Sequence, residues 1–224
     1  MKPTWIKFSF LYLALYGLGI LALGLGVSLF ARANLGVAPW DTAILNLQRL
    51  LAVNNIQITI GQSSFIHTSV LLLTVLILGR AWQSLLAIFP MILISLSIDL
   101  WDLGLLPALG VQDLSLPLRI VAFLGALFLM TWGLATIIIS GFPPNVYDDF
   151  HLTILRVFKI KSFTNARWIV EFLGVFTGLT YALIQGEGLG SITMLSFVLA
   201  LAFGSLISYF VNRYRRAKLI NRVL

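Results

Sequence analysis

The chain of 224 residues lacks cysteine altogether and has few charged side chains. The absence of cysteine excludes disulfides, thiolate nucleophiles and cysteine-bound metals. Its two histidines do not form a His-Glu-x-x-His pattern, and the chain has neither a P-loop nor a Gly-x-Ser-x-Gly motif. We therefore expect no catalytic residues, no metal and no cofactor, and so not an enzyme.

Hydrophobic residues are what the chain has in excess. They make up 59% of it, against 10% charged residues, and the mean hydropathy is +0.99. Several apolar runs reach the roughly 20 residues needed to cross a hydrocarbon core. These runs are Phe8–Ala31, Gln62–Gly79, Ala81–Trp101, Leu118–Ser140, Arg167–Gln185 and Leu189–Val211. The first has no cleavage pattern behind it, so we interpret it as a helix and not as a signal peptide. The sequence predicts an all-α membrane protein with six transmembrane helices.

Lysine and arginine are divided unevenly between the two sides of the predicted membrane. With a cytoplasmic N-terminus, Arg32, Arg49 and Arg119 lie outside and the other twelve of the 15 basic residues lie inside. Basic loops face the cytoplasm, so we predict that both termini are cytoplasmic. The basic tail 213–224 is then expected to bind anionic lipid headgroups. The net charge of +7 therefore implies no nucleic acid as a partner, and a homodimer stays open.

The chain repeats itself at an offset of 107 residues. The matched pairs are Gly26 with Gly133, Trp40 with Tyr147, Asp41 with Asp148, Arg49 with Arg156, Gly79 with Gly186 and Ser84 with Ser191. Polar matches at constant offset predict two three-helix repeats, 1–106 and 107–212. Because each half has an odd number of spans, the second enters the membrane from the opposite side, which makes an inverted 3+3 repeat. Secondary transporters use this architecture and bind substrate where the repeats meet.

A half-helix is predicted after the first span, in the stretch NLGVAPWDTAILNLQRLLAV. Gly36 and Pro39 argue against a helix over Asn34–Trp40, whereas Asp41–Val53 has a helical pattern with Asp41 at the N-cap. Its narrow polar face recurs in the second half: Thr42, Asn46 and Arg49, then Asp149, Thr153 and Arg156. Such half-helices are either re-entrant, which places Asp41 and Asp148 at the floors of opposed cavities, or amphipathic and flat in the interface.

The segment ANLGVAPWDTAIL carries a resemblance to a known family. Its Gly-x-x-Pro-Trp-Asp box, Gly36 to Asp41, follows a glycine-rich first helix, and Gly61 opens the second. With the halved three-plus-three plan, this box resembles the YczE/YyaS/YitT group of bacterial multi-pass membrane proteins. The resemblance implies a six-helix fold in the bacterial inner membrane and brings no settled substrate. In the second half the chain departs from the group's Gly-Pro-x-Asp turn and has SGFPPNVYDDF instead.

The candidate site residues are polar or aromatic and lie in or beside the predicted spans. The substrate-binding candidates are Trp40, Asp41, Thr42, Asn46, Arg49, Asp148, Asp149 and Arg156, and the proton-relay candidates are His67 and Glu171. Simpler interpretations exist for the relay pair. Glu171 has the i,i+4 spacing of a membrane-edge ion pair with Arg167, and His67 suits a neutral imidazole bonded to a neighbouring helix.

These features favour a small secondary transporter or permease-like protein of unknown substrate, in which one half moves against the other. Asp41 and Asp148 would bind a proton or a cation, and Arg49 and Arg156 would steer an anion; the sequence does not choose between them. The alternative is a non-transporting membrane scaffold or accessory protein that regulates a partner complex. An occluded polar cavity between the halves favours the transporter, and a dry, packed interface favours the scaffold.

Overall fold

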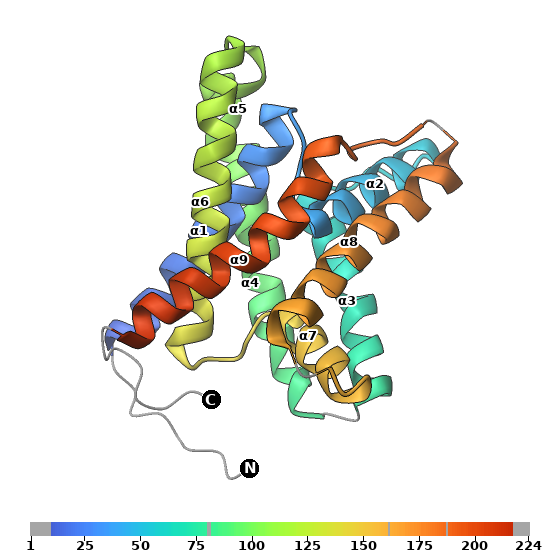
Figure 1. Ribbon diagram of the computed structural model, residues 1–224. Helices are drawn as coiled ribbons and strands as arrows, with labels where there is room; N and C mark the ends of the chain where they lie inside the picture. The colour runs from blue at the N-terminus through green and yellow to red at the C-terminus, as the bar shows by residue number, and fades with distance from the viewer. Residues whose placement is uncertain (1–9, 80–81, 161, 187, 217–224) are drawn as a thin grey trace.

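The computed structural model describes residues 10–79, 82–160, 162–186 and 188–216, and these residues form helices and connecting loops without a β-strand (Figure 1). In chain order the elements are α1 Phe10–Ala33, α2 Pro39–Val53, α3 Ile60–Gly79, η1 Trp82–Ala87, α4 Ile88–Asp99, η2 Leu100–Leu105, α5 Leu106–Leu109, η3 Val111–Asp113, α6 Leu116–Ser140, α7 Val146–Val157, α8 Phe163–Gln185 and α9 Met194–Arg216. Several predicted cytoplasmic basic residues lie outside the described residues: Lys2, Lys7, Arg80, Lys161, Lys218 and Arg222. The same holds for the basic tail beyond Arg216.

Six helices of the described chain are long and apolar enough to cross a membrane. They are α1, α3, the composite helix Trp82–Leu109, α6, Asn165–Gln185 of α8 and Met194–Tyr214 of α9. The prediction of an all-α protein with six such helices is confirmed. The third span is longer than predicted, because a π-helical turn at Leu100–Leu105 carries the chain past Trp101 to Leu109.

The two predicted half-helices are present as α2 and α7. The prediction that Asp41 is the N-cap of the first is wrong: α2 begins at Pro39, its N-cap is Ala38, and Asp41 lies in the first turn. Proline suits this first position because its φ is already helical and its missing N–H has no partner there anyway. In Figure 1, α2 lies in the upper half of the molecule beside α8, and α7 lies in the lower half beside α3.

Close helix packing organises the rest of the bundle. The most extensive contact between two helices joins α1 to α6. There a Cβ on Gly19 would lie 2.8 Å from the carbonyl oxygen of Gly133. A Cβ on Gly133 would meet the Gly19 oxygen equally closely, so both positions need glycine. Helix α4 packs on α1, and α9 packs on α6. The apolar core between them is centred on Phe30, which contacts Phe123 edge to face and also lies against Phe203.

Candidate functional site

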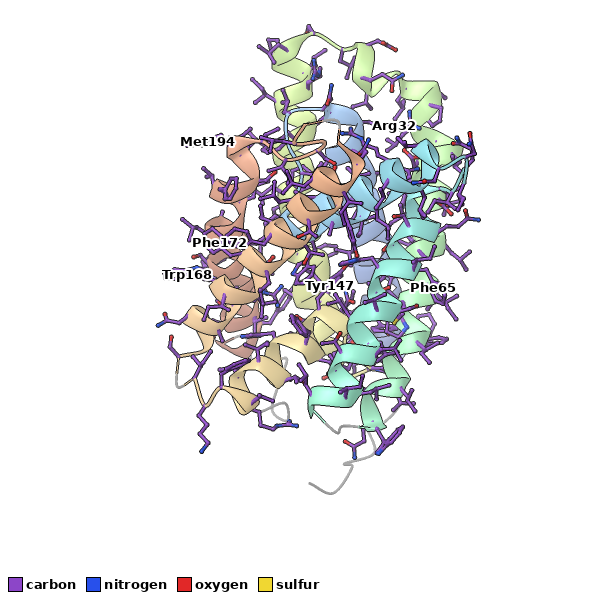
Figure 2. All side chains as sticks on the ribbon, turned by 90° about the vertical axis from the view of Figure 1, so that its right-hand side faces the viewer. Arg32, Phe65, Tyr147, Trp168, Phe172 and Met194 are labelled. Atoms are coloured by element: carbon purple, nitrogen blue, oxygen red, sulfur yellow. The ribbon has the colours of Figure 1, made fainter. Side chains whose placement is uncertain are left out.

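The first turns of α2 and α7 meet inside the molecule. The ring centroid of Trp40 lies 5.0 Å from that of Tyr147, and these are two residues that the repeat pairs with each other. His67 of α3 lies beside both rings, 5.7 Å from Trp40 and 6.4 Å from Tyr147, and contacts Tyr181 of α8 at 6.1 Å. Figure 2 shows Tyr147 in the interior, whereas Phe65 and Trp168 lie at the edges of the molecule.

A buried ion-pair network lies next to these aromatic rings. Arg167 donates from Nε to Glu171 Oε1 and from Nη1 to Asp148 Oδ1, each at 2.8 Å. Arg167, Glu171 and Asp148 are 4%, 2% and 7% exposed. The i,i+4 pair of Arg167 with Glu171 is therefore present, and it is buried inside the protein. A buried charge without its partner is strongly destabilising, so each of these three charged side chains needs the network to remain buried.

Asp41 completes the cluster from the other half-helix. Asp41 is 4% exposed, and its Oδ2 atom has no hydrogen-bond partner among the described residues. The same is true of Trp40 Nε1, both ring nitrogens of His67, Tyr147 OH and Asp148 Oδ2. Apart from Ser95 Oγ, every buried side-chain nitrogen or oxygen without a partner in the described part of the chain belongs to this cluster. Buried polar atoms are normally paired, so this concentration points to a place that binds water or a ligand.

A cavity of about 50 Å³ lies where these groups converge. A water molecule in the liquid takes up roughly 30 Å³, so this volume holds about one or two. Its polar wall comes from α2, α3, α7 and α8, and its apolar wall from α1, α4, α6 and α9. The lining residues are Leu23, Val27, Ala38, Trp40, Asp41, Ile44, Ser64, Ile94, Ile98, Met130, Leu134, Asn145, Tyr147, Arg167, Glu171 and Phe203. Both halves of the chain thus enclose one small, partly polar space.

The half-helices lie outside the six membrane-spanning helices, and burial changes the acidity of their side chains. Burial, helped by the nearby Glu171 charge, raises the pKa of Asp41 to about 8. The pKa of Tyr147 is raised as well, first by burial and then by the charge of Asp41. Burial also raises the pKa of Asp149, although a hydrogen bond to Ser84 opposes this change. The cluster therefore favours the protonated form of Asp41 near neutral pH.

Thr42 and Asn46, two predicted site residues, face α8 instead of the cavity. Thr42 Oγ1 donates to the Pro39 carbonyl within α2 at 2.6 Å and lies 3.4 Å from the Gly174 carbonyl oxygen of α8. Asn46 Nδ2 donates to the Gly178 carbonyl of α8 at 3.0 Å. Asn46 Oδ1 accepts from the N–H and the hydroxyl of Ser191 at 2.8 and 2.7 Å. The polar face of α2 thus attaches the half-helix to α8 and to the α8–α9 connection.

The structure does not bring three further candidates to the cavity. Arg49 and Arg156 are exposed in the later turns of α2 and α7, and Asp149 is half-buried and bonded to Ser84. Sequence reasoning missed Ser64 and Tyr181, and it missed the bond from Arg167 to Asp148. One signal was available: an arginine within an apolar run needs a partner inside the protein.

The fold and the site together define a multi-pass membrane protein with a buried ionisable cluster between two half-helices. Residues 10–212 match DUF6198, a family of unknown function, and the chain belongs to that family.

Two relatives from Bacillus subtilis (strain 168) are similar to the chain. The uncharacterized protein YyaS is 29% identical over 159 residues, which cover 70% of this chain and 75% of YyaS. The uncharacterized membrane protein YczE is 28% identical over 153 residues, or 68% of this chain and 64% of YczE. The resemblance carried by the Gly36–Asp41 box is thereby confirmed. No solved structure matches the chain significantly.

Proposed function

We propose that the protein is a small secondary transporter or permease-like protein of the bacterial inner membrane. The observation that carries this proposal is the cavity of about 50 Å³ enclosed by both halves of the chain, into which unpaired buried polar groups converge. A dry, fully packed interface would suit a non-transporting scaffold, whereas a cavity with ionisable and hydroxyl groups on one wall supports a solute pathway. The substrate is a small solute or ion, bound beside Trp40, Asp41 and the Arg167 network.

The two halves are proposed to be an inverted repeat, 1–106 and 107–212. The packing supports this division, because each contact has a counterpart: α2 on α8 corresponds to α7 on α3, and α4 on α1 corresponds to α9 on α6. The equivalent residues Trp40 and Tyr147 lie against each other, as expected for residues beside a pseudo-two-fold axis.

The half-helices are proposed to be re-entrant. The buried first turns of α2 and α7 and the exposed side chains of Arg49 and Arg156 support this arrangement, since each half-helix runs from the interior toward the surface. Irregular backbone at membrane depth is tolerated where protein buries it, as it does residues 36–38 before α2 and Asn145 before α7. Rocking of one half against the other would then open the cavity to each side in turn.

A single cysteine placed in this cysteine-free chain tests the proposal. Ser64 lines the cavity and is 4% exposed, so Ser64→Cys is unreactive toward a membrane-impermeant thiol reagent unless the cavity opens. We expect slow but complete labelling in membranes. Ser28→Cys is the matched control, because Ser28 is fully buried, is not part of the cavity lining and bonds to the Gly24 and Ile98 carbonyls. Equal protection of both cysteines would contradict a transporter and favour a scaffold.

A further inference from the structure

The ionisable groups around the cavity do not balance one another. Asp41, Asp148 and Glu171 are three carboxyl groups around one guanidinium, that of Arg167. The first turns of α2 and α7 bring two helix N-termini to the same place, each equivalent to roughly half a positive charge. If every carboxyl group were ionised, about one negative charge would remain in a buried site, which is energetically costly.

We infer that one exchangeable proton, held on Asp41, neutralises this cluster and is the ion to which solute movement is coupled. The coupling rests on the proposed transport function, whereas the proton site itself does not. Protonation forms one O–H bond on the Asp41 carboxylate and breaks one O–H bond of a hydronium ion from the bulk solution, which leaves a neutral water molecule.

The hydrogen bonds select Asp41 among the three carboxyl groups. Asp148 and Glu171 each accept a charge-assisted bond from Arg167, which favours their ionised form. Asp41 has no such bond from Arg167, and its buried Oδ2, like Asp148 Oδ2, is unpaired among the described residues. An unpaired carboxylate oxygen is much costlier to bury than a neutral carboxyl group.

Among the described residues around Asp41, no cationic side chain besides Arg167 is available to neutralise the Asp41 carboxylate in place of a proton. Helix α8 presents Arg167, Glu171 and Tyr181, α7 presents Tyr147 and Asp148, and α3 presents His67. The described side chains that α1, α4, α6 and α9 contribute to the cavity lining are all apolar. Arg167 already serves both other carboxylates, so Asp41 has no guanidinium of its own.

The donor set favours a proton over a metal cation. The backbone groups that two helix N-termini present are N–H donors, whereas metal cations are bound by carbonyl oxygens and the C-terminal ends of half-helices. The described residues contain no group of three or more His, Asp or Glu side chains arranged to hold a metal ion. A proton resides on the carboxyl oxygen itself and tolerates this positive surrounding.

Infrared spectroscopy of the full chain in lipid nanodiscs tests the inference directly. We expect the native protein to show the C=O stretch of a protonated carboxyl group at neutral pH, and this band to disappear as the pH rises. Asp41→Asn should remove the band. Asp113→Asn, in an exposed 3-10 turn, is the matched control and should keep it. A native spectrum without the band at neutral pH, or an unchanged band in Asp41→Asn, would overturn the inference.

Two more measurements distinguish a proton on Asp41 from a bound metal cation and from a proton on a distant carboxyl group. Replacing potassium by sodium at constant pH should leave the band unchanged, and its loss on adding sodium would overturn the proton in favour of a metal cation. Glu171→Gln removes a neighbouring negative charge, so it should shift the disappearance of the band by about one pH unit to lower pH. This variant decides the matter if Asp41→Asn does not insert, because an unshifted band contradicts the inference.

The two proposals fail in different ways. If Ser64→Cys is labelled but the native protein lacks the band, transport stands and the proton site falls. If the band is present but Ser64→Cys is protected, the proton site stands and the transport function with its coupling falls.

Discussion

Arg167 is the residue on which the buried cluster depends. Arg167→Ala leaves the carboxylates of Glu171 and Asp148 buried without a partner, which we expect to cost about 3–5 kcal/mol. The measurement is the apparent melting temperature of the purified protein in detergent, with loss of monodisperse protein as the extreme result. Arg167→Lys should be intermediate, because an ammonium group cannot reproduce the two-sided guanidinium geometry.

Arg156→Ala provides the control for this change. Arg156 is exposed, so its replacement should alter stability by no more than about 0.5 kcal/mol. Equal melting temperatures for Arg167→Ala and Arg156→Ala would show that the buried network contributes nothing to the fold.

Single-residue chemistry was only partly predictable from the sequence. The four-residue spacing identified the Arg167–Glu171 pair, since local spacing on a helix determines which side chains meet. It did not reveal that Asp148, nineteen residues earlier, reaches the same guanidinium, because that contact depends on how α7 folds onto α8. The same limit applies to Arg49 and Arg156, whose matched positions suggested a shared role although the structure leaves both exposed.

Helix packing at α2 and α8 decides where Asp41 lies. A Cβ on Gly178 would lie 2.8 Å from the carbonyl carbon of Thr42 and 2.9 Å from the nitrogen of Ala43, both backbone atoms. Gly178→Ala should therefore push α2 away from α8 and destabilise the protein by about 1–3 kcal/mol. Thermal unfolding measures this, and the displaced half-helix should also make Ser64→Cys react faster.

Gly125→Ala is the matched change on α6. A Cβ there would meet nothing within 4 Å, so stability should be unchanged or slightly increased. A destabilisation equal to that of Gly178→Ala would contradict the proposed role of the α2–α8 contact.

Elements were more predictable than their contacts. Hydrophobic run length identified every spanning helix of the described chain, and Pro39 was a start signal for α2 that outranked Asp41 as a cap. The α2–α8 contact had a sequence signal as well, because Gly174 and Gly178 form a Gly-x-x-x-Gly spacing typical of close helix packing. Nothing local indicated that this glycine face meets Thr42 and Asn46 in particular, since that pairing depends on the arrangement of both halves.

At the scale of the whole molecule, two sets of four helices enclose one charged site. Neither half contains the site alone: Trp40 and Asp41 come from the first, and Tyr147, Asp148, Arg167 and Glu171 from the second. A change in the angle between the halves would therefore alter the distance between Asp41 and the Arg167 network. Such a coupling of charge to shape is what an ion-coupled transporter requires.

The orientation of the molecule in the membrane is a prediction for the whole chain. The connection between α5 and α6 lies at the top of Figure 1, and that between α7 and α8 lies at the bottom. The distribution of basic residues places the first outside and the second in the cytoplasm. We expect an impermeant thiol reagent to label Leu114→Cys in intact cells, and Ser162→Cys only after the membrane is opened.

The cysteine-free parent chain serves as the blank for this labelling, and both variants must be present at equal levels. The reverse pattern would invert the orientation, so that the α2 half-helix would begin its course from the cytoplasmic side and the α7 half-helix from the outside. Labelling of both cysteines in intact cells would instead contradict the number of crossings between the two positions. That number is odd in the predicted arrangement, because α6 crosses the membrane while the re-entrant α7 returns to the side from which it entered.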